Sequence, residues 1–319
     1  MRYIVLFLYF LFSFSLLFSQ EYVSFQKYDS VGLERLDLYN KLHYINLTLS
    51  NDNIERIDNL LKDCSDRIKT LYLQNIILDE HVLDFIVKSQ PKEINLSFIK
   101  QINSISFFKT LSMLDSLYSL RIYNCDLSYI PEEIGEMSQL TRLEICYCPL
   151  RFLPNSLENL KNLQYLRIND TEINYIPKSF SLNNLIVLDI SSNRFNGIPR
   201  EVKQLLNMEC FKFSNNIYFS DDDSILTINT KLNEVYLVQC GIEVFPKNLI
   251  ALQNLEILVV IENKINGITY DFIKDFPKLK YLGLGLQSYI LNKTEIDKIF
   301  NSDIDINVSI FDDSPLRYD

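Results

Sequence analysis

Apolar residues recur with a period of 22 or 23 positions between residues 117 and 199. The repeated unit reads L-x-x-L-x-[IL]-x-x-[NCT]-x-[LIF]-x-x-[IL]-P-x-x-[ILFV], and its first positions are Leu117, Leu140, Leu163 and Leu185. Alternation at positions four to seven predicts a short strand, with positions four and six buried and positions five and seven turned outward. The proline lacks an amide donor and disfavours helix in the residue before it. The second half of each unit is therefore expected to be extended or to begin with a short helical turn.

The same register continues in both directions from this block. It gives eleven repeats over residues 44–302 and a degenerate last unit that begins near Asp303. Residues 54–64, 81–90 and 294–302 have helical spacing without an internal proline, and residues 102–116 leave room for a longer helix. The additional units begin at Tyr44, Ile68, Pro91, Met208, Leu232, Leu255 and Leu279.

This unit resembles the leucine-rich repeat, whose period is 20 to 29 residues, in the L-P-x-x-L form of secreted bacterial proteins. The resemblance implies an α/β fold, a curved solenoid with a single parallel β-sheet on the concave face. Short helices and extended or 3-10 segments are then expected on the convex face. The resemblance also implies a non-enzymatic module that recognises a protein through the concave sheet. Because each repeat buries its apolar edge only against its neighbours, one domain is expected despite the 319 residues.

Both ends of the chain depart from the repeat. Arg2 precedes an uncharged stretch from Tyr3 to Phe18, followed by Ser19 and Gln20, which is typical of a secretory signal peptide over residues 1–20. This stretch is shorter than the roughly 20 residues that span a membrane. Cleavage near Ser19/Gln20 predicts a secreted or periplasmic protein with no membrane insertion of the mature chain. An N-terminal cap is expected over residues 21–43, and a C-terminal cap strand and tail over residues 303–319.

Charge limits the kinds of partner. The formal net charge is −10, whereas a protein that binds a phosphate backbone needs a surplus of Lys and Arg on one face. Nucleic acid is therefore not expected as a partner.

Six cysteines in an exported chain raise the question of disulfides. Cys125, Cys148 and Cys240 occupy position nine of the unit, where a buried small polar group bonds the backbone of the turn after the strand. This position favours structural thiols. Cys125 and Cys148, in adjacent repeats, are the one pair whose disulfide state stays open.

Catalytic and metal-binding motifs are absent from the sequence. The chain has two histidines and seven glycines, and it contains no G-x-S-x-G, H-E-x-x-H, C-x-x-C or Gly-rich phosphate loop. We therefore expect no enzyme, no cofactor and no metal site.

Position five of the unit carries charges of alternating sign from Arg121 through Glu144, Arg167 and Asp189 to Lys212. Neighbouring parallel strands lie about 4.8 Å apart, so these side chains are expected to form a ladder of opposite charges on the concave sheet. One interpretation is a solvent-facing sheet whose ion pairs contribute at most about 1 kcal/mol each. The other is a stripe that binds a partner.

Tyrosines and arginines on either side of the ladder favour the partner-binding interpretation, because both residue types are enriched at binding hot spots. Three arginines over a negatively charged protein predict a local positive patch. The alternative partner is a surface glycan or peptidoglycan, with tyrosines stacked on sugar rings. The predicted partner-binding residues are Arg121, Tyr123, Arg142, Glu144, Tyr147, Tyr165, Arg167, Asp170 and Asp189.

Towards the C-terminus, outward positions that are usually polar become apolar or glycine, and Leu286 is one of them. An exposed apolar patch usually marks an interface, so a homotypic contact through Val238, Val259 and Ile261 is one possibility. The other is that residues 301–319 fold back and cover the patch.

Overall fold

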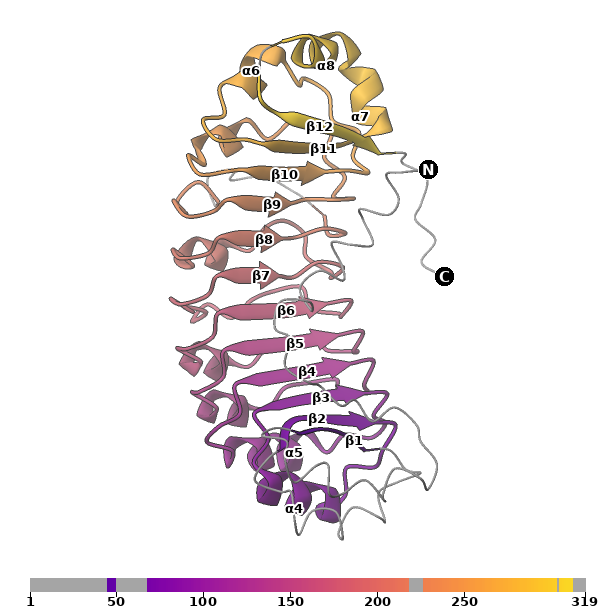
Figure 1. Cartoon of the computed structure of the whole chain (residues 1–319), viewed down its shortest axis with the longest axis vertical. Helices are drawn as coiled ribbons and strands as arrows, with labels where there is room; N and C mark the ends of the chain where they lie inside the picture. The colour runs from indigo at the N-terminus through magenta and orange to yellow at the C-terminus, as the bar shows by residue number, and fades with distance from the viewer. Residues whose placement is uncertain (1–44, 50–67, 218–225, 303, 312–319) are drawn as a thin grey trace.

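The computed structural model describes residues 45–49, 68–217, 226–302 and 304–311, the first of these ranges for its backbone alone. These residues form one twelve-stranded sheet in which the strands follow one another in sequence order (Figure 1). Every pair of neighbouring strands is parallel, as the repeat predicts. The predicted signal peptide and N-terminal cap, residues 1–43, and the predicted helix over residues 54–64 lie outside the described residues.

One strand comes from each repeat, and a last one comes from the degenerate unit. The strands are β1 (Ile45–Leu49), β2 (Ile68–Gln74), β3 (Glu93–Ser97), β4 (Ser119–Tyr123), β5 (Arg142–Cys146), β6 (Tyr165–Asn169), β7 (Val187–Asp189), β8 (Cys210–Lys212), β9 (Glu234–Tyr236), β10 (Ile257–Val260), β11 (Tyr281–Gly285) and β12 (Asn307–Phe311).

The strand register matches the unit position for position. Leu143, at position four, pairs with Leu120 on one side and Leu166 on the other, and position-six isoleucines pair in the same way. The last unit is displaced, because Val308 pairs with Leu282 and this register starts the unit at Asp305 rather than near Asp303. Positions four and six of the central units are fully buried, so the core is a rod of leucine and isoleucine columns behind the sheet.

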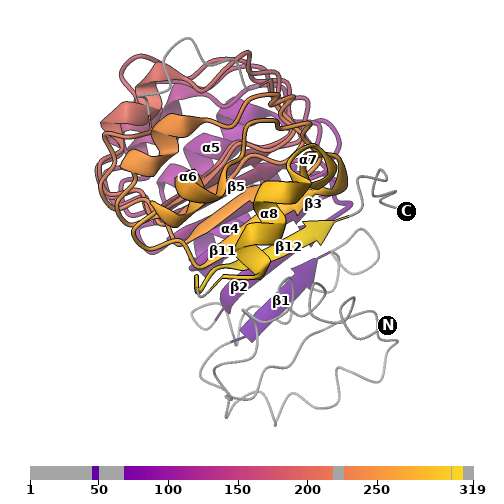
Figure 2. The same ribbon diagram turned by 90° about the horizontal axis from the view of Figure 1, so that it is seen from above.

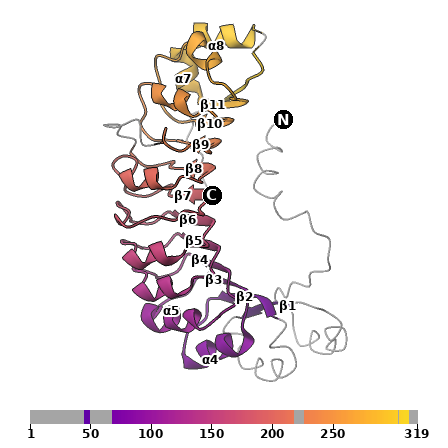
Figure 3. The same ribbon diagram turned by 90° about the vertical axis from the view of Figure 1, so that its left-hand side faces the viewer.

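The other side of the solenoid carries the predicted mixture of helices and short turns (Figure 3). Helices α4 (Glu80–Ser89), α5 (Ser104–Ser112) and α8 (Lys293–Phe300) confirm three sequence predictions. Five units carry the proline of the repeat. Single 3-10 turns follow Pro131, Pro154, Pro199 and Pro246, whereas Pro177 is followed by an ordinary turn. The turns are η4 (Glu132–Glu136), η5 (Asn155–Asn159), η6 (Arg200–Gln204) and η7 (Lys247–Ala251).

Two helices near the C-terminus depart from the repeat pattern. They are α6 (Tyr270–Lys274) and α7 (Leu286–Leu291), and Figure 2 shows them with α8 around the end of the solenoid. The placement of Leu286 on the outward face of a strand is therefore wrong, because β11 ends at Gly285 and Leu286 begins α7.

Position eight of the unit, within three residues after the end of the strand, is left-handed in nine consecutive repeats. In the first eight of these repeats its backbone N–H donates to the carbonyl of position seven in the next repeat, for example from Tyr147 to Asn169 and from Asn124 to Cys146. The left-handed residues are Asn75, Phe98, Asn124, Tyr147, Asp170, Ser192, Asn215, Gln239 and Glu262.

Position nine turns inward and bonds the backbone of the loop. Asn193 Nδ2 donates to the carbonyls of Ile168, 2.7 Å away, and of Ile190, 2.8 Å away. Cys125 and Cys148 replace asparagine here, and each thiol donates to the carbonyl two residues earlier. Neither cysteine forms a disulfide in the structure. Burial raises the pKa of Cys125 to about 11 and that of Cys148 to about 12, so these thiols stay neutral and unreactive.

Candidate functional site

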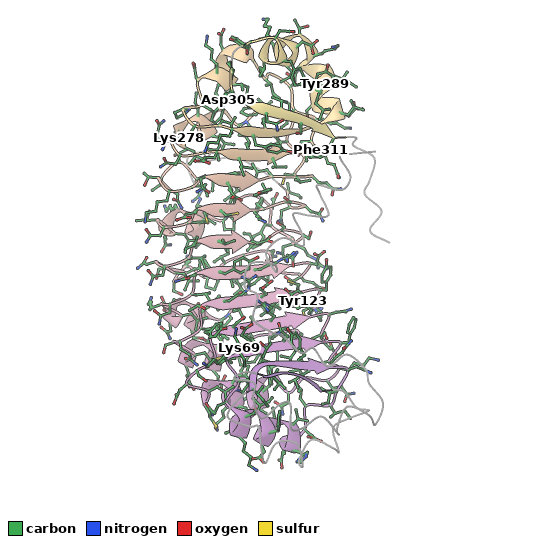
Figure 4. All side chains as sticks on the ribbon, in the orientation of Figure 1. Lys69, Tyr123, Lys278, Tyr289, Asp305 and Phe311 are labelled. Atoms are coloured by element: carbon green, nitrogen blue, oxygen red, sulfur yellow. The ribbon has the colours of Figure 1, made fainter. Side chains whose placement is uncertain are left out.

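The outward residues of β4, β5 and β6 meet around one carboxylate, that of Glu144. Its Oε1 accepts hydrogen bonds from Arg121 Nε at 3.0 Å and from Arg142 Nε at 2.5 Å. Its Oε2 accepts a bond from Tyr123 Oη at 2.5 Å. We call Arg121, Tyr123, Arg142, Glu144 and Tyr165 the concave cluster. Tyr123 marks its place at the carboxyl end of β4 (Figure 4).

Arg142 is fixed on its other side by an aromatic ring. Its guanidinium carbon lies 3.8 Å from the centre of the Tyr165 ring, which is the geometry of a cation–π contact. In the part of the chain that the structure describes, only Nε of this guanidinium is hydrogen-bonded, so its two terminal amino groups remain available to a ligand. The arrangement presents a flat, charged and already positioned side chain on the open sheet.

Glu144 is the most buried member of the cluster, with a side chain that is 3% exposed. Burial by itself favours the neutral acid, but the hydrogen bond from Tyr123 and the charges of Arg142 and Arg121 hold its pKa below the ordinary value. Burial and the bond to this carboxylate raise the pKa of Tyr123 well above its ordinary value. Tyr123 therefore stays a neutral donor at physiological pH.

A second ion pair lies beside the cluster. Arg167 Nε is 3.2 Å from Asp189 Oδ2, and the Asp189 side chain is 8% exposed. Burial opposes the charge of Arg167, but Asp189 outweighs that effect and raises the arginine's pKa. Burial raises the pKa of Asp170, which lies at the rim. These residues, which the sequence assigned to one stripe, thus form two separate groups.

The charge ladder is present as a column but not as a chain of ion pairs. The register places Arg121, Glu144, Arg167 and Asp189 side by side, yet within this column of described residues ion pairs join only Arg121 to Glu144 and Arg167 to Asp189. Carboxylates within hydrogen-bonding reach of Arg121, Arg142 and Arg167 offset part of the predicted positive charge. Glu144 and Asp189 lie under these arginines and are not exposed contact residues.

Sequence reasoning missed one carboxylate that shapes this site. Glu93 accepts a 2.5 Å hydrogen bond from Tyr118 Oη and lies 3.8 Å from Arg121 Nη1. Asn95 Oδ1 also accepts a bond from Arg121 Nη1, at 3.2 Å. Both residues belong to the preceding strand, and Glu93 is at position three, outside the charge column. Reading positions three and five together would have identified it.

Tyr147 lies apart from the concave cluster. It is 59% exposed, occupies the left-handed position eight after β5 and stands at the rim of the sheet.

The apolar end of the sheet is less open than its sequence predicts, because Val259 is 8% exposed. A Cβ at Gly283 would lie 3.2 Å from Val259 Cγ1 and 3.5 Å from Ile261 Cδ1, so these side chains already close over the glycine.

Changing Glu144 to glutamine is expected to lower the free energy of unfolding by about 1–2 kcal/mol at pH 7, because hydrogen bonds to charged partners are lost. The folded-state pKa of Glu144 is depressed, so its contribution is present above the unfolded value of about 4.3 and is lost as the pH falls through the folded value. Urea unfolding at pH 7 and at pH 3 measures both effects. The gap between wild type and variant should narrow at pH 3, and a gap that widens would contradict this assignment.

No three His, Cys, Asp or Glu side chains in the described residues lie together so that they could hold a metal ion. No helix in the same ranges has the length and apolarity to cross a membrane.

Sequence comparison identifies the repeat. Residues 184–205 match the family described as Leucine Rich Repeat. Receptor like protein 28 of Arabidopsis thaliana is 30% identical over 126 residues, which cover 40% of this chain and 13% of that protein. This chain therefore corresponds to a small part of the relative's length.

Solved structures share the architecture at low identity. An internalin of Listeria monocytogenes gives a TM-score of 0.58 at 20% identity, over 92% of this chain and 82% of that one. TLR13 in complex with ssRNA13 gives 0.62 at 20% identity, over 75% and 35%. The plant peptide hormone receptor RGFR1 in complex with RGF2 gives 0.52 at 19% identity, over 77% and 45%. These likenesses confirm the solenoid fold and carry no function by themselves.

Proposed function

Because this chain is a leucine-rich-repeat protein with an open, structured sheet face, we propose that it is a non-enzymatic protein-binding module whose contact surface is the concave cluster. The observation that carries the proposal is Arg142, stacked on Tyr165 and bonded to buried Glu144. Both side chains are held in place before a partner arrives, so binding orders little that is not ordered already. Arginine and tyrosine in a fixed geometry are typical of interface hot spots.

Two related folds bind different kinds of ligand, a peptide hormone in RGFR1 and RNA in TLR13. Charge favours a protein or peptide for this chain. The formal net charge is −10, and Arg121, Arg142 and Arg167 already form ion pairs with Glu144 and Asp189. A phosphate backbone would gain little from arginines in that state. The proposed setting is the secreted or periplasmic space that the signal-like residues 1–20 predict.

The test uses the wild-type chain to capture a protein from a surface extract of its host and then measures the affinity of that pair. The double change Arg142→Lys and Tyr165→Ala should weaken binding at least 30-fold, since one hot-spot residue is worth about 2 kcal/mol or more. Lysine keeps a charge beside Glu144 but cannot reproduce the flat stack.

The matched control is Arg151→Lys with Tyr175→Ala, the same two exchanges at exposed positions on the flank of the solenoid. It should leave the affinity unchanged. Equal binding by the folded concave double variant, or no captured protein with the wild-type chain, would refute the proposal.

A further inference from the structure

A shallow depression of about 770 Å³ runs along the rim of the sheet, at the carboxyl ends of β2 to β5. Phe98 and Tyr147 stand on it from units that are two repeats apart, 50% and 59% exposed. Gln74, Asn75 and Asn124, whose side chains end in carboxamides, also line it. We call the surface formed by Gln74, Asn75, Phe98, Asn124 and Tyr147 the rim depression. It lies outside the concave cluster.

The two rings stand where the backbone least favours them. Phe98 and Tyr147 have φ of 56° and 55°, a left-handed conformation that bulky residues rarely adopt. Asn75 and Asn124 hold the same position in neighbouring repeats, and asparagine tolerates this conformation well. Because the Phe98 ring is about half exposed and the Tyr147 ring more than half exposed, core packing does not account for these two residues. Such residues at a strained backbone position point to a role in binding.

The three carboxamides are not committed to the fold. In the described part of the chain, the side chains of Gln74, Asn75 and Asn124 are exposed and make no hydrogen bond. By contrast, Asn216 and Asn263 bond several loop backbone groups with their amides. A carboxamide both donates and accepts, as a sugar hydroxyl does.

The depression offers side chains only. The backbone N–H groups of Asn75, Phe98 and Asn124 already donate to Ser97, Tyr123 and Cys146 in the next repeat. An extended peptide could therefore not add itself as a strand here. The charged lining residues, Lys100 and Asp126, have opposite signs, so the depression as a whole suits an uncharged ligand.

We propose that the rim depression binds a neutral sugar ring of a polysaccharide. Position-eight residues two repeats apart are separated by about 10 Å, twice the strand spacing, which admits one ring between Phe98 and Tyr147. The C–H face of the sugar packs against an aromatic face, and its hydroxyls bond the carboxamides of Gln74, Asn75 and Asn124. Tyr147, predicted from sequence for the protein-binding stripe, belongs to this second site.

Titration calorimetry with cellohexaose, maltohexaose and hexa-N-acetylchitohexaose, all of them uncharged, tests the proposal. At least one should bind the wild-type chain, and the double variant Phe98→Asn and Tyr147→Asn should weaken that binding at least tenfold. Asparagine already occupies this position in other repeats, so the variant should keep or raise the melting temperature. The control Phe152→Asn with Tyr175→Asn removes an exposed aromatic pair on the flank, with centroids 6.1 Å apart, and should bind as the wild type does.

Failure of all three hexasaccharides to bind wild type overturns the proposal, as does unchanged binding by the rim variant. A captured protein lost by the rim variant, without any sugar binding, would also overturn it and make the rim part of the protein interface. The concave double variant should still bind sugar. The two sites are thereby tested separately.

Discussion

Replacing Leu143 with alanine is expected to lower the free energy of unfolding by about 2–5 kcal/mol, which is the range for truncating a buried leucine. Leu143 is 0% exposed and sits between Leu120 and Leu166 in the neighbouring strands. In a solenoid each repeat is stabilised only by its two neighbours, so a cavity at the centre weakens both contacts at once. Urea unfolding followed by circular dichroism measures the change.

Leu206→Ala is the matched control for this prediction. Leu206 is 54% exposed, so the same exchange should change the free energy of unfolding by no more than about 0.5 kcal/mol. A small effect at Leu143, comparable with that at Leu206, would show that the leucine column is not the core of the repeat.

The leucine column could be predicted because the repeat constrains it twice. The period aligns equivalent residues of successive strands, and the alternation within a strand decides which of them turn inward. Leu143 and Arg142 are neighbours in sequence, and both were placed on the correct face. The single 3-10 turn after Pro154 is one of the two forms, extended or a short helical turn, that proline's missing donor predicts. These features depend on the backbone and on spacing alone.

The concave cluster could be predicted only as a set of outward residues. Which partner each long side chain selects depends on rotamers and on neighbours in three strands, and sequence spacing does not define those. Glu144 therefore looked like an exposed contact, whereas Arg121 and Arg142 cover it. Glu93 was missed because it reaches Arg121 from position three of the previous repeat. A charged column read from sequence thus predicts position but not exposure.

The left-handed position eight was also missed, although asparagine recurs there at Asn75, Asn124 and Asn215. Asparagine is one of the few residues that adopt this conformation readily, so its recurrence was the available signal. Phe98 and Tyr147 concealed it, because aromatic residues at the end of a strand look like ordinary strand residues. The departure from the local rule is itself informative, since it singled out the rim depression.

Asn263→Ala should be among the most destabilising single changes in the chain, by about 3–5 kcal/mol. Asn263 is 2% exposed, and its Oδ1 accepts from the backbone N–H of Cys240 at 2.9 Å and of Ile242 at 3.0 Å. Its Nδ2 donates to the carbonyl of Leu237 at 2.7 Å. Alanine leaves these buried groups without a partner, and each unsatisfied group costs about 1–3 kcal/mol. Thermal and urea unfolding of the variant measure the loss.

Two companion variants distinguish the bonding of buried backbone groups by Asn263 from the simple loss of an amide side chain. Asn254→Ala removes two exposed bonds, one from Nδ2 to the Thr230 carbonyl and one that Oδ1 accepts from Lys278 Nζ, and should cost less than about 1.5 kcal/mol. Asn263→Cys should fall between the two, because Cys240 fills the same position one repeat earlier and its thiol reaches the Val238 carbonyl at 3.4 Å. The expected order of destabilisation follows the number of backbone groups left without a partner, which is highest in Asn263→Ala and lowest in Asn254→Ala. If Asn263→Ala proved as mild as Asn254→Ala, position nine would not hold the turns of this solenoid together.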